Sequence, residues 1–161
     1  MELPKKLIDS VVEENTQQGN VIKCFSYDLN ISLKDKVLIH KEKRLVIVSR
    51  CFIEEYNVHS EYYGCIYINS DNYPDISDDH ILKSQQLLAR ASKYPGILKK
   101  DSFFDCSALT IKSAYDIKYL VETEPGRVLG RIDDEDINTI RKVLRDSITI
   151  PAKKKKIFGL M

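Results

Sequence analysis

The sequence has no excess of charge of either sign. Its 161 residues contain 25 lysines and arginines against 24 aspartates and glutamates, which gives a formal net charge of +1. A polycationic chain is therefore excluded, and any nucleic-acid binding has to come from a local basic surface. Long apolar runs are also missing, since no stretch approaches the roughly 18 residues that a membrane span needs. Residues 1–10 contain two lysines and no hydrophobic signal-peptide core, so we expect a cytoplasmic protein with no membrane contact.

Paired, metal-binding cysteines are absent as well. Cys24, Cys51, Cys65 and Cys106 form no CxxC pair, and none stands near a histidine at zinc-finger spacing. Each lies in or beside an apolar run, which is typical of small buried side chains in a reducing compartment. We therefore expect no metal site and no other cofactor.

What the sequence does contain is the composition of one globular domain. Hydrophobic residues make up 43% and charged residues 30% of the chain, which is ordinary for a protein that buries a real core. There is no internal repeat and no convincing linker. We divide the chain into an N-terminal helix (residues 1–20), a main domain (21–150) and a basic tail (151–161).

Three segments have helical patterns. In residues 3–18, Leu7, Ile8, Val11 and Val12 form one apolar stripe. Residues 81–91 have a similar spacing of apolar side chains and predict a short helix. The strongest helix signal follows Asp133, a good N-cap residue, because an apolar face and a basic C-terminal end come after it.

Strand patterns occupy most of the remaining chain. Residues 36–40 and 44–50 predict a hairpin around a polar turn at 41–43. The second of these strands is apolar on both faces at 45–48, which indicates a central strand. Further strands are expected at 62–69, within 101–111 and at 127–132, with residues 51–60 as a connection. The four lysines at 153–156 predict a solvated tail or, alternatively, a contact with RNA phosphates.

The order of these segments resembles the MazF/PemK (Kid) family of toxin–antitoxin ribonucleases, over about residues 33–147. Residues 43–49 (KRLVIVS) are similar to the family's K-R-P-V-V-V-[LIV]-S strand, with leucine where proline is usual. Residues 67–70 (YINS) take the place of P-[IV]-T-S. Residues 99–102 (KKDS) and 109–112 (LTIK) match the strand that ends in R-T-I-D, and residues 129–132 (LGRI) precede the closing helix, as in the family.

The resemblance implies a fold and a set of partners. The fold class is α+β: a small SH3-like β-barrel with an N-terminal helix and a C-terminal amphipathic helix. The activity would be metal-independent cleavage of single-stranded RNA by a homodimer, which an antitoxin protein holds in check.

Cleavage of this kind needs a base for the ribose 2′-hydroxyl, an acid for the leaving oxygen and a cation for the phosphate. The resemblance assigns the catalytic roles to Arg44, Ser70 and Asp105. Arg44 matches the family's strand arginine and Ser70 its small hydroxyl residue. Asp105 lies one place out of register with the family's Arg/Asp pair, so it is either a site member or a structural residue.

RNA contacts are expected from Lys43, Asn69, His40 and His59. Asn69 stands where the family has threonine and can donate a hydrogen bond to a phosphate, although it does not titrate at neutral pH. Either histidine could act as a base near pH 7. Two alternatives remain: a non-catalytic nucleic-acid- or protein-binding module on the same barrel, and a gyrase inhibitor that resembles CcdB.

Overall fold

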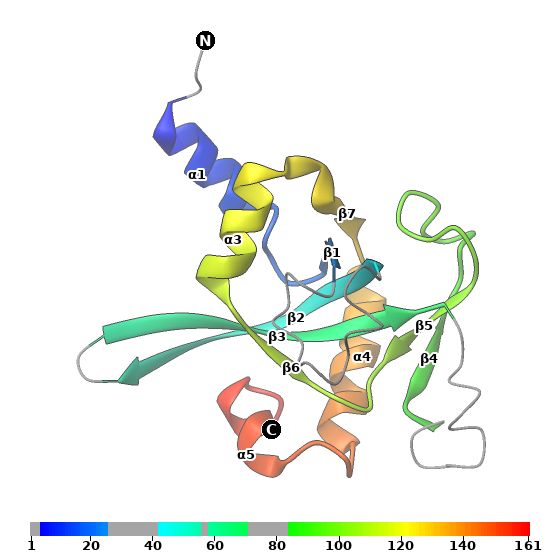
Figure 1. The fold of residues 1–161 in the computed structure, drawn as a ribbon. Coiled ribbons are helices and arrows are strands. Elements are labelled where there is room, and N and C mark those ends of the chain that lie inside the picture. Colours follow the sequence, from blue (N-terminus) through cyan, green and yellow to red (C-terminus); the bar gives the residue numbers. More distant parts are fainter. Residues whose placement is uncertain (1–3, 26–41, 56–57, 71–83) are drawn as a thin grey trace.

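The computed structural model describes residues 4–25, 42–55, 58–70 and 84–161. These residues form an α+β fold in which one antiparallel sheet is curled into half a barrel and carries helices on both faces (Figure 1). The strands are β1 (Asn20–Phe25), β2 (Glu42–Glu55), β3 (Val58–Asn69), β4 (Gln86–Ala89), β5 (Ser102–Asp105), β6 (Thr110–Ser113) and β7 (Val128–Arg131). Their order is β4-β5-β3-β2-β1-β7, and β6 pairs with β3. The predicted α+β class is confirmed.

The centre of the sheet is β2. Its residues Leu45, Val46, Ile47 and Val48 have no exposed surface, so both faces of the strand are covered. This confirms the central position that the continuous apolar run predicted. The two covers produce two hydrophobic cores, one on each side of the sheet.

The first core lies under α1 (Lys5–Glu14) and α3 (Ala114–Thr123). Val12 from α1 and Ile117 and Val121 from α3 are buried there. The larger core on the opposite side lies under α4 (Asp134–Asp146) and includes Ile137, Ile140 and Leu144. As expected, Asp133 caps α4, because its Oδ1 accepts the backbone N–H of Asp136 at 2.8 Å.

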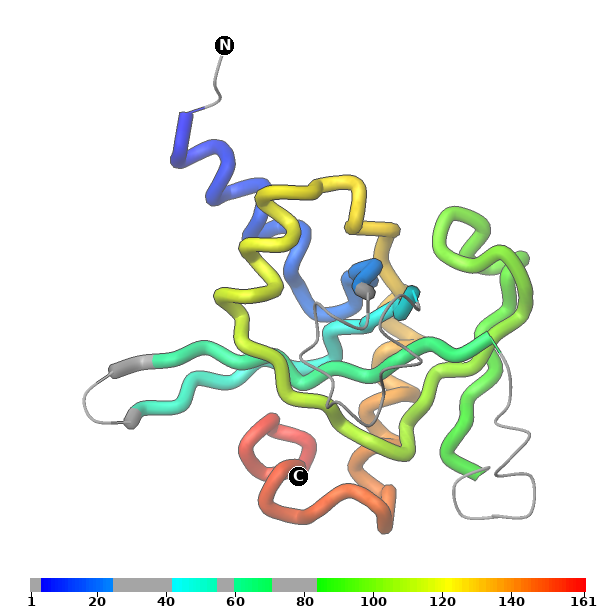
Figure 2. The backbone as a smooth tube through the Cα atoms, in the orientation of Figure 1, coloured from blue at the N-terminus to red at the C-terminus, as the bar shows by residue number. Residues whose placement is uncertain are grey.

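A short C-terminal helix, α5 (Ala152–Ile157), closes the larger core. Phe158 and Leu160 after it are 1% and 0% exposed. Gly64 makes room for this segment, since a Cβ at that position would lie 3.0 Å from Phe158 Cδ1. The expectation of a solvated tail is therefore wrong, and Figure 2 shows the C-terminus folded back beneath the long strands.

Three other expectations need correction. The helix expected at 81–91 is wrong for its C-terminal half, where Gln86–Ala89 is strand β4, paired with β5. Residues 51–55 and 58–60 belong to the hairpin of β2 and β3 rather than to a connection. The strand expected within 101–111 is two short strands, β5 and β6, which pair with different parts of β3. The proposed strand at 36–40 lies outside the described residues.

The remaining general predictions concern cysteines and membranes. All four cysteines are buried, as predicted, and none forms a disulfide. Among the described residues, no helix combines the length and the apolar character that crossing a bilayer requires.

Candidate functional site

Six polar or aromatic residues meet at one end of the sheet, where β2 begins and β3 ends. We call them the sheet-end cluster: Lys23, Lys43, Arg44, Tyr67, Asn69 and Asp105. Strand register brings them together, because Arg44 pairs with Lys23 of β1 on one side and with Ile68 of β3 on the other. Ile68 in turn pairs with Phe104 of β5.

Arg44 is the member of this cluster with a buried, unpaired side-chain nitrogen among the described residues. Its Nη2 lies 3.4 Å from Glu42 Oε1, and its side chain is 20% exposed. Its Nε is buried and has no hydrogen-bond partner among the described residues. Buried polar atoms are almost always paired, so the hydrogen-bonding capacity of this guanidinium is not fully used.

Lys23 adds a second positive charge beside Arg44. The two residues are direct cross-strand partners, and like charges in such positions destabilise a sheet. An anion held between them would remove this repulsion. The arrangement therefore favours a phosphate or carboxylate at this point of the strand pair.

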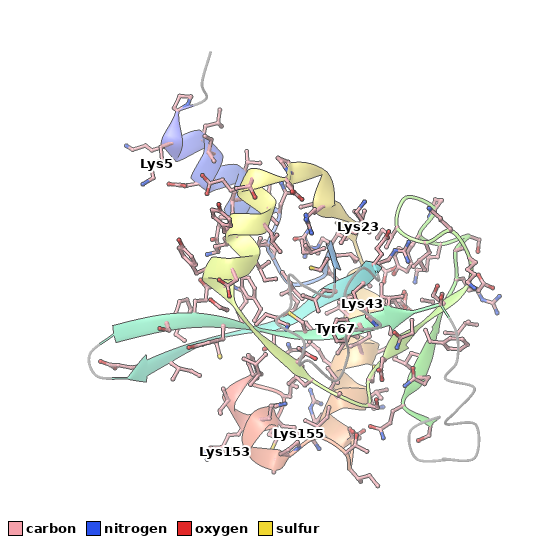
Figure 3. All side chains as sticks on the ribbon, viewed as in Figure 1. Lys5, Lys23, Lys43, Tyr67, Lys153 and Lys155 are labelled. Carbon is pink, nitrogen blue, oxygen red and sulfur yellow. The ribbon has the colours of Figure 1, made fainter. Side chains whose placement is uncertain are left out.

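Lys43, Tyr67 and Asn69 occupy the other face of the same strand ends. The Lys43 ammonium lies 5.8 Å from the centroid of the Tyr67 ring, which is within the range of a cation–π contact. Figure 3 shows Lys43 and Tyr67 as neighbours, with Lys23 on the adjacent strand. Burial is the main cause that raises the pKa of Tyr67, so its phenol stays neutral at physiological pH.

Asp105 is held in a network of its own. Its Oδ1 accepts hydrogen bonds from Gln86 Nε2 at 2.8 Å, Ser107 N at 3.0 Å and Ser107 Oγ at 2.5 Å. Its Oδ2 accepts Asn69 Nδ2 at 3.4 Å. Much of the acceptor capacity of the carboxylate is therefore used to fix β5 and the turn after it.

The other predicted site residues are not part of this arrangement. Ser70 follows β3 directly and is exposed. His59 pairs with Glu54 near the opposite end of β3. Ten residues separate it from Asn69 along the strand, or about 33 Å. His40 lies outside the described residues.

A second group of charges lies on the face covered by α1 and α3, and we call it the helix-face cluster: Glu13, Arg50, Glu61 and Lys118. Arg50 Nε donates to Glu61 at 2.7 Å and its Nη2 to Glu13 at 2.9 Å. Lys118 Nζ lies 3.1 Å from Glu61 and 2.9 Å from Glu13. Two cations and two carboxylates thus form a closed ring that fastens both helices to the sheet.

The pKa values in this ring follow from its pairing. The hydrogen bond from Lys118 is the largest influence on Glu13 and lowers its pKa, although burial opposes it. Burial alone would lower the pKa of Lys118, but its hydrogen bonds to Glu13 and Glu61 raise it overall. Each charge is thereby stabilised by its neighbours, which indicates a structural role.

The lysines of α5 divide into two pairs. Lys154 Nζ donates to Leu109 O at 2.8 Å, and Lys155 Nζ to Arg145 O at 2.8 Å. Lys153 and Lys156 are exposed. Half of the basic run therefore anchors the C-terminal segment, well away from Lys43 and Tyr67 (Figure 3).

Metal binding finds no support in the described part of the chain, where no three His, Cys, Asp or Glu side chains are grouped as ligands. Two cavities lie elsewhere. One of about 610 Å³ borders α4 at Lys142 and Asp146, and one of about 340 Å³ borders α3 at Tyr115 and Lys118. Neither is lined by a member of the sheet-end cluster.

Sequence reasoning missed Lys23 and Tyr67. A signal for Tyr67 was present, because alternate residues of a strand share a face and Tyr67 precedes Asn69 by two. Lys23 could not be found in this way, since its position beside Arg44 depends on the pairing of β1 with β2.

No family model matches the chain, and neither does any curated protein or solved structure.

Proposed function

We propose that the chain binds single-stranded RNA at the sheet-end cluster and cleaves it without a metal, as the resemblance to MazF/PemK toxins implies. The observation that carries the proposal is the buried, unpartnered Nε of Arg44 beside Lys23. A phosphodiester at the exposed part of the Arg44 side chain would accept hydrogen bonds from the guanidinium and neutralise the cross-strand repulsion. The SH3-like identity of the half barrel, an antitoxin partner and a homodimer belong to the same proposal.

The residues divide the work of binding between them. Arg44 and Lys23 hold a phosphate on one face of the strand ends. On the opposite face, the half-buried ring of Tyr67 offers a surface on which a base stacks, with Lys43 at its face. Sites that bind single-stranded nucleic acids usually combine basic side chains with aromatic rings on which the bases stack. In cleavage, Arg44 would stabilise the charge that develops on the phosphate after attack by the 2′-hydroxyl.

The experiment uses the purified full chain and a fluorescently labelled 20-nucleotide RNA of mixed sequence in EDTA. Binding is measured by anisotropy, and cleavage by gel electrophoresis with analysis of the new ends. Attack by the 2′-hydroxyl leaves a 2′,3′-cyclic phosphate and a 5′-hydroxyl. We expect Arg44→Gln to weaken binding by about tenfold, as loss of a charged hydrogen bond does.

Arg131→Gln is the matched control, because Arg131 is an exposed arginine on strand β7, which pairs with β1 and not with β2. It should bind RNA like the unmodified chain. Failure of the unmodified chain to bind RNA at low salt would overturn the proposal.

A second candidate function, RNA binding without cleavage, is favoured by the bonding of Asp105. A carboxylate that accepts from Gln86, Ser107 and Asn69 is poorly placed to take a ribose proton as well. Binding that depends on Arg44 but yields no cyclic-phosphate ends would support this alternative over the nuclease.

A further inference from the structure

The hairpin of β2 and β3 extends beyond the rest of the sheet as a two-stranded arm (Figures 1 and 2). β6 pairs with β3 only from Tyr62 to Cys65. From Val58 to Glu61, β3 has β2 on one side and no strand on the other among the described residues. Two-stranded ribbons are marginal alone, and such an edge is a template for another strand.

A cavity lies at the point where β6 leaves this edge. Its volume is about 340 Å³, and its lining is Ser60, Glu61, Tyr62, Ser113, Ala114, Tyr115 and Lys118. Ser113 pairs with Tyr62, so two more strand residues would have lain opposite Glu61 and Ser60. The chain instead begins α3 at Ala114. The cavity therefore occupies the space that a continued β6 would have filled.

Exposed aromatic side chains occur on the elements that border this cavity, and one of them, Tyr115, lines it. Tyr115 is 77% and Tyr119 58% exposed, one helical turn apart on α3, and Phe52 on the arm is 68% exposed. Aromatic side chains are enriched at protein interfaces relative to other surfaces. An exposed tyrosine at an open strand edge, with a second one turn further along α3, favours a surface that is covered in a complex.

The charge around the cavity selects the kind of partner. Lys118 and Arg50 are already paired with Glu13 and Glu61. Asp116 and Glu122 are exposed on α3, on the same helix as the two tyrosines. The balance of exposed charge on α3 beside the aromatic residues is negative, which complements a basic segment.

We propose that the outer edge of β3 at Ser60 and Glu61, with the cavity beside α3, is the docking site for an extended basic peptide of a partner protein. The peptide adds as a strand antiparallel to β3, in line with β6. Its main chain bonds to the β3 edge, alternate aliphatic side chains fill the cavity, and its lysines or arginines meet the acidic residues of α3. This site is independent of the proposed RNA site.

The test titrates the isotope-labelled full chain with an acetylated octapeptide of alternating lysine and valine, followed by amide chemical shifts. Shifts should concentrate at Ser60–Tyr62 and Ser113–Tyr115. The same peptide with N-methylated amides on its bonding edge should bind at least tenfold more weakly, because strand addition needs those donors. An octapeptide of alternating glutamate and valine should also bind more weakly.

Two substitutions complete the test. Asp116→Lys should lower the affinity for the lysine peptide about threefold or more, and Tyr115→Ala should lower it about tenfold. Asp134→Lys is the matched control for charge and for position in the first turn of a helix, since Asp134 begins α4; it should leave binding unchanged. Circular dichroism verifies that each variant is folded.

Three results would overturn the docking site. They are no shifts at millimolar peptide, equal binding of the N-methylated peptide, and shifts that centre on Lys43 and Asn69 instead. None of them bears on whether the sheet-end cluster binds RNA.

Discussion

The sheet-end cluster and the helix-face cluster contain similar residue types but satisfy them to different degrees. In the helix-face cluster, Arg50 and Lys118 each contact both Glu13 and Glu61. In the sheet-end cluster, Arg44 has a carboxylate at 3.4 Å, and its buried Nε has no partner within the described part of the chain. Charged side chains that are fully paired with one another indicate a structural role. A charged side chain that is only partly paired is a candidate for binding a ligand.

Each region also has a buried polar side-chain atom, and the two atoms differ in how close they lie to solvent. The hydroxyl of Tyr63, beside Arg50, is buried next to Thr16, and Tyr63 has no exposed surface. Arg44 is 20% exposed. A ligand from solvent can therefore reach part of the Arg44 side chain, although not its buried Nε, and it cannot reach Tyr63. The candidate site is distinguished by an arginine side chain that is both partly exposed to solvent and incompletely hydrogen-bonded, and neither property alone would be sufficient.

The largest effect on stability is expected for Glu61→Gln. Glu61 is 14% exposed and pairs with Arg50 and Lys118, so its loss leaves two partly buried cations with one carboxylate between them. We expect the free energy of unfolding in urea to fall by about 2–3 kcal/mol. Glu122→Gln, an exposed control on α3, should change it by less than about 0.5 kcal/mol. If both substitutions changed the free energy of unfolding equally, the structural role of the helix-face cluster would be contradicted.

A smaller loss, about 1–2 kcal/mol, is expected for Asp105→Asn. An amide in place of the carboxylate turns an NH₂ group toward the donors of Gln86 or Ser107. Urea unfolding measures the loss, and the RNA assay is run in parallel. A variant of unchanged stability that no longer cleaves RNA would instead identify Asp105 as a catalytic residue.

Acid should weaken the helix-face cluster through Glu13. Its pKa is lowered from the ordinary value of 4.5 by its partners, so its contribution to stability is complete above about that pH and disappears as pH falls through the lowered pKa. In Glu13→Gln this contribution is missing at every pH. The difference in unfolding free energy between the two chains should shrink from pH 6 to pH 3; a constant difference would contradict the pairing.

The smallest effect on stability is expected for Arg44→Gln. Arg44 makes one long contact with Glu42 and faces Lys23 across the strands, so its removal should change the free energy of unfolding by no more than about 0.5 kcal/mol. Thermal or urea unfolding measures this. A loss as large as that of Glu61→Gln would mean that Arg44 is a structural residue.

Local patterns predicted the parts of the fold in which sequence neighbours decide the outcome. The cap at Asp133 and the continuous apolar run at 45–48 are of this kind. Residues 86–89 were expected in a helix because apolar spacing there suits one, but pairing with β5 makes them a strand. The C-terminal segment is buried because Phe158 fits against Gly64, a contact between residues far apart in the sequence.

The candidate site was predictable to a similar extent. Lys43, Arg44, Asn69 and Asp105 were named from motifs, and the structure brings them to one end of the sheet. The hydrogen bonds that these side chains make could not be predicted. Those of Asp105 depend on the positions of Gln86 and Ser107, and the unpaired Nε of Arg44 depends on all the residues packed around it. The helix-face cluster joins residues that are as far apart in the sequence as Glu13 and Lys118, so no local sequence pattern predicts it.

The salt dependence of RNA binding tests the central claim most directly. Dissociation constants for the labelled RNA are measured from 50 to 300 mM salt for the unmodified chain, Arg44→Gln and Arg131→Gln. If Arg44 contacts a phosphate, the slope of log K against log salt concentration falls by about 0.7 in Arg44→Gln and stays unchanged in Arg131→Gln. Equal slopes in all three proteins would contradict the assignment of the sheet-end cluster as the RNA site.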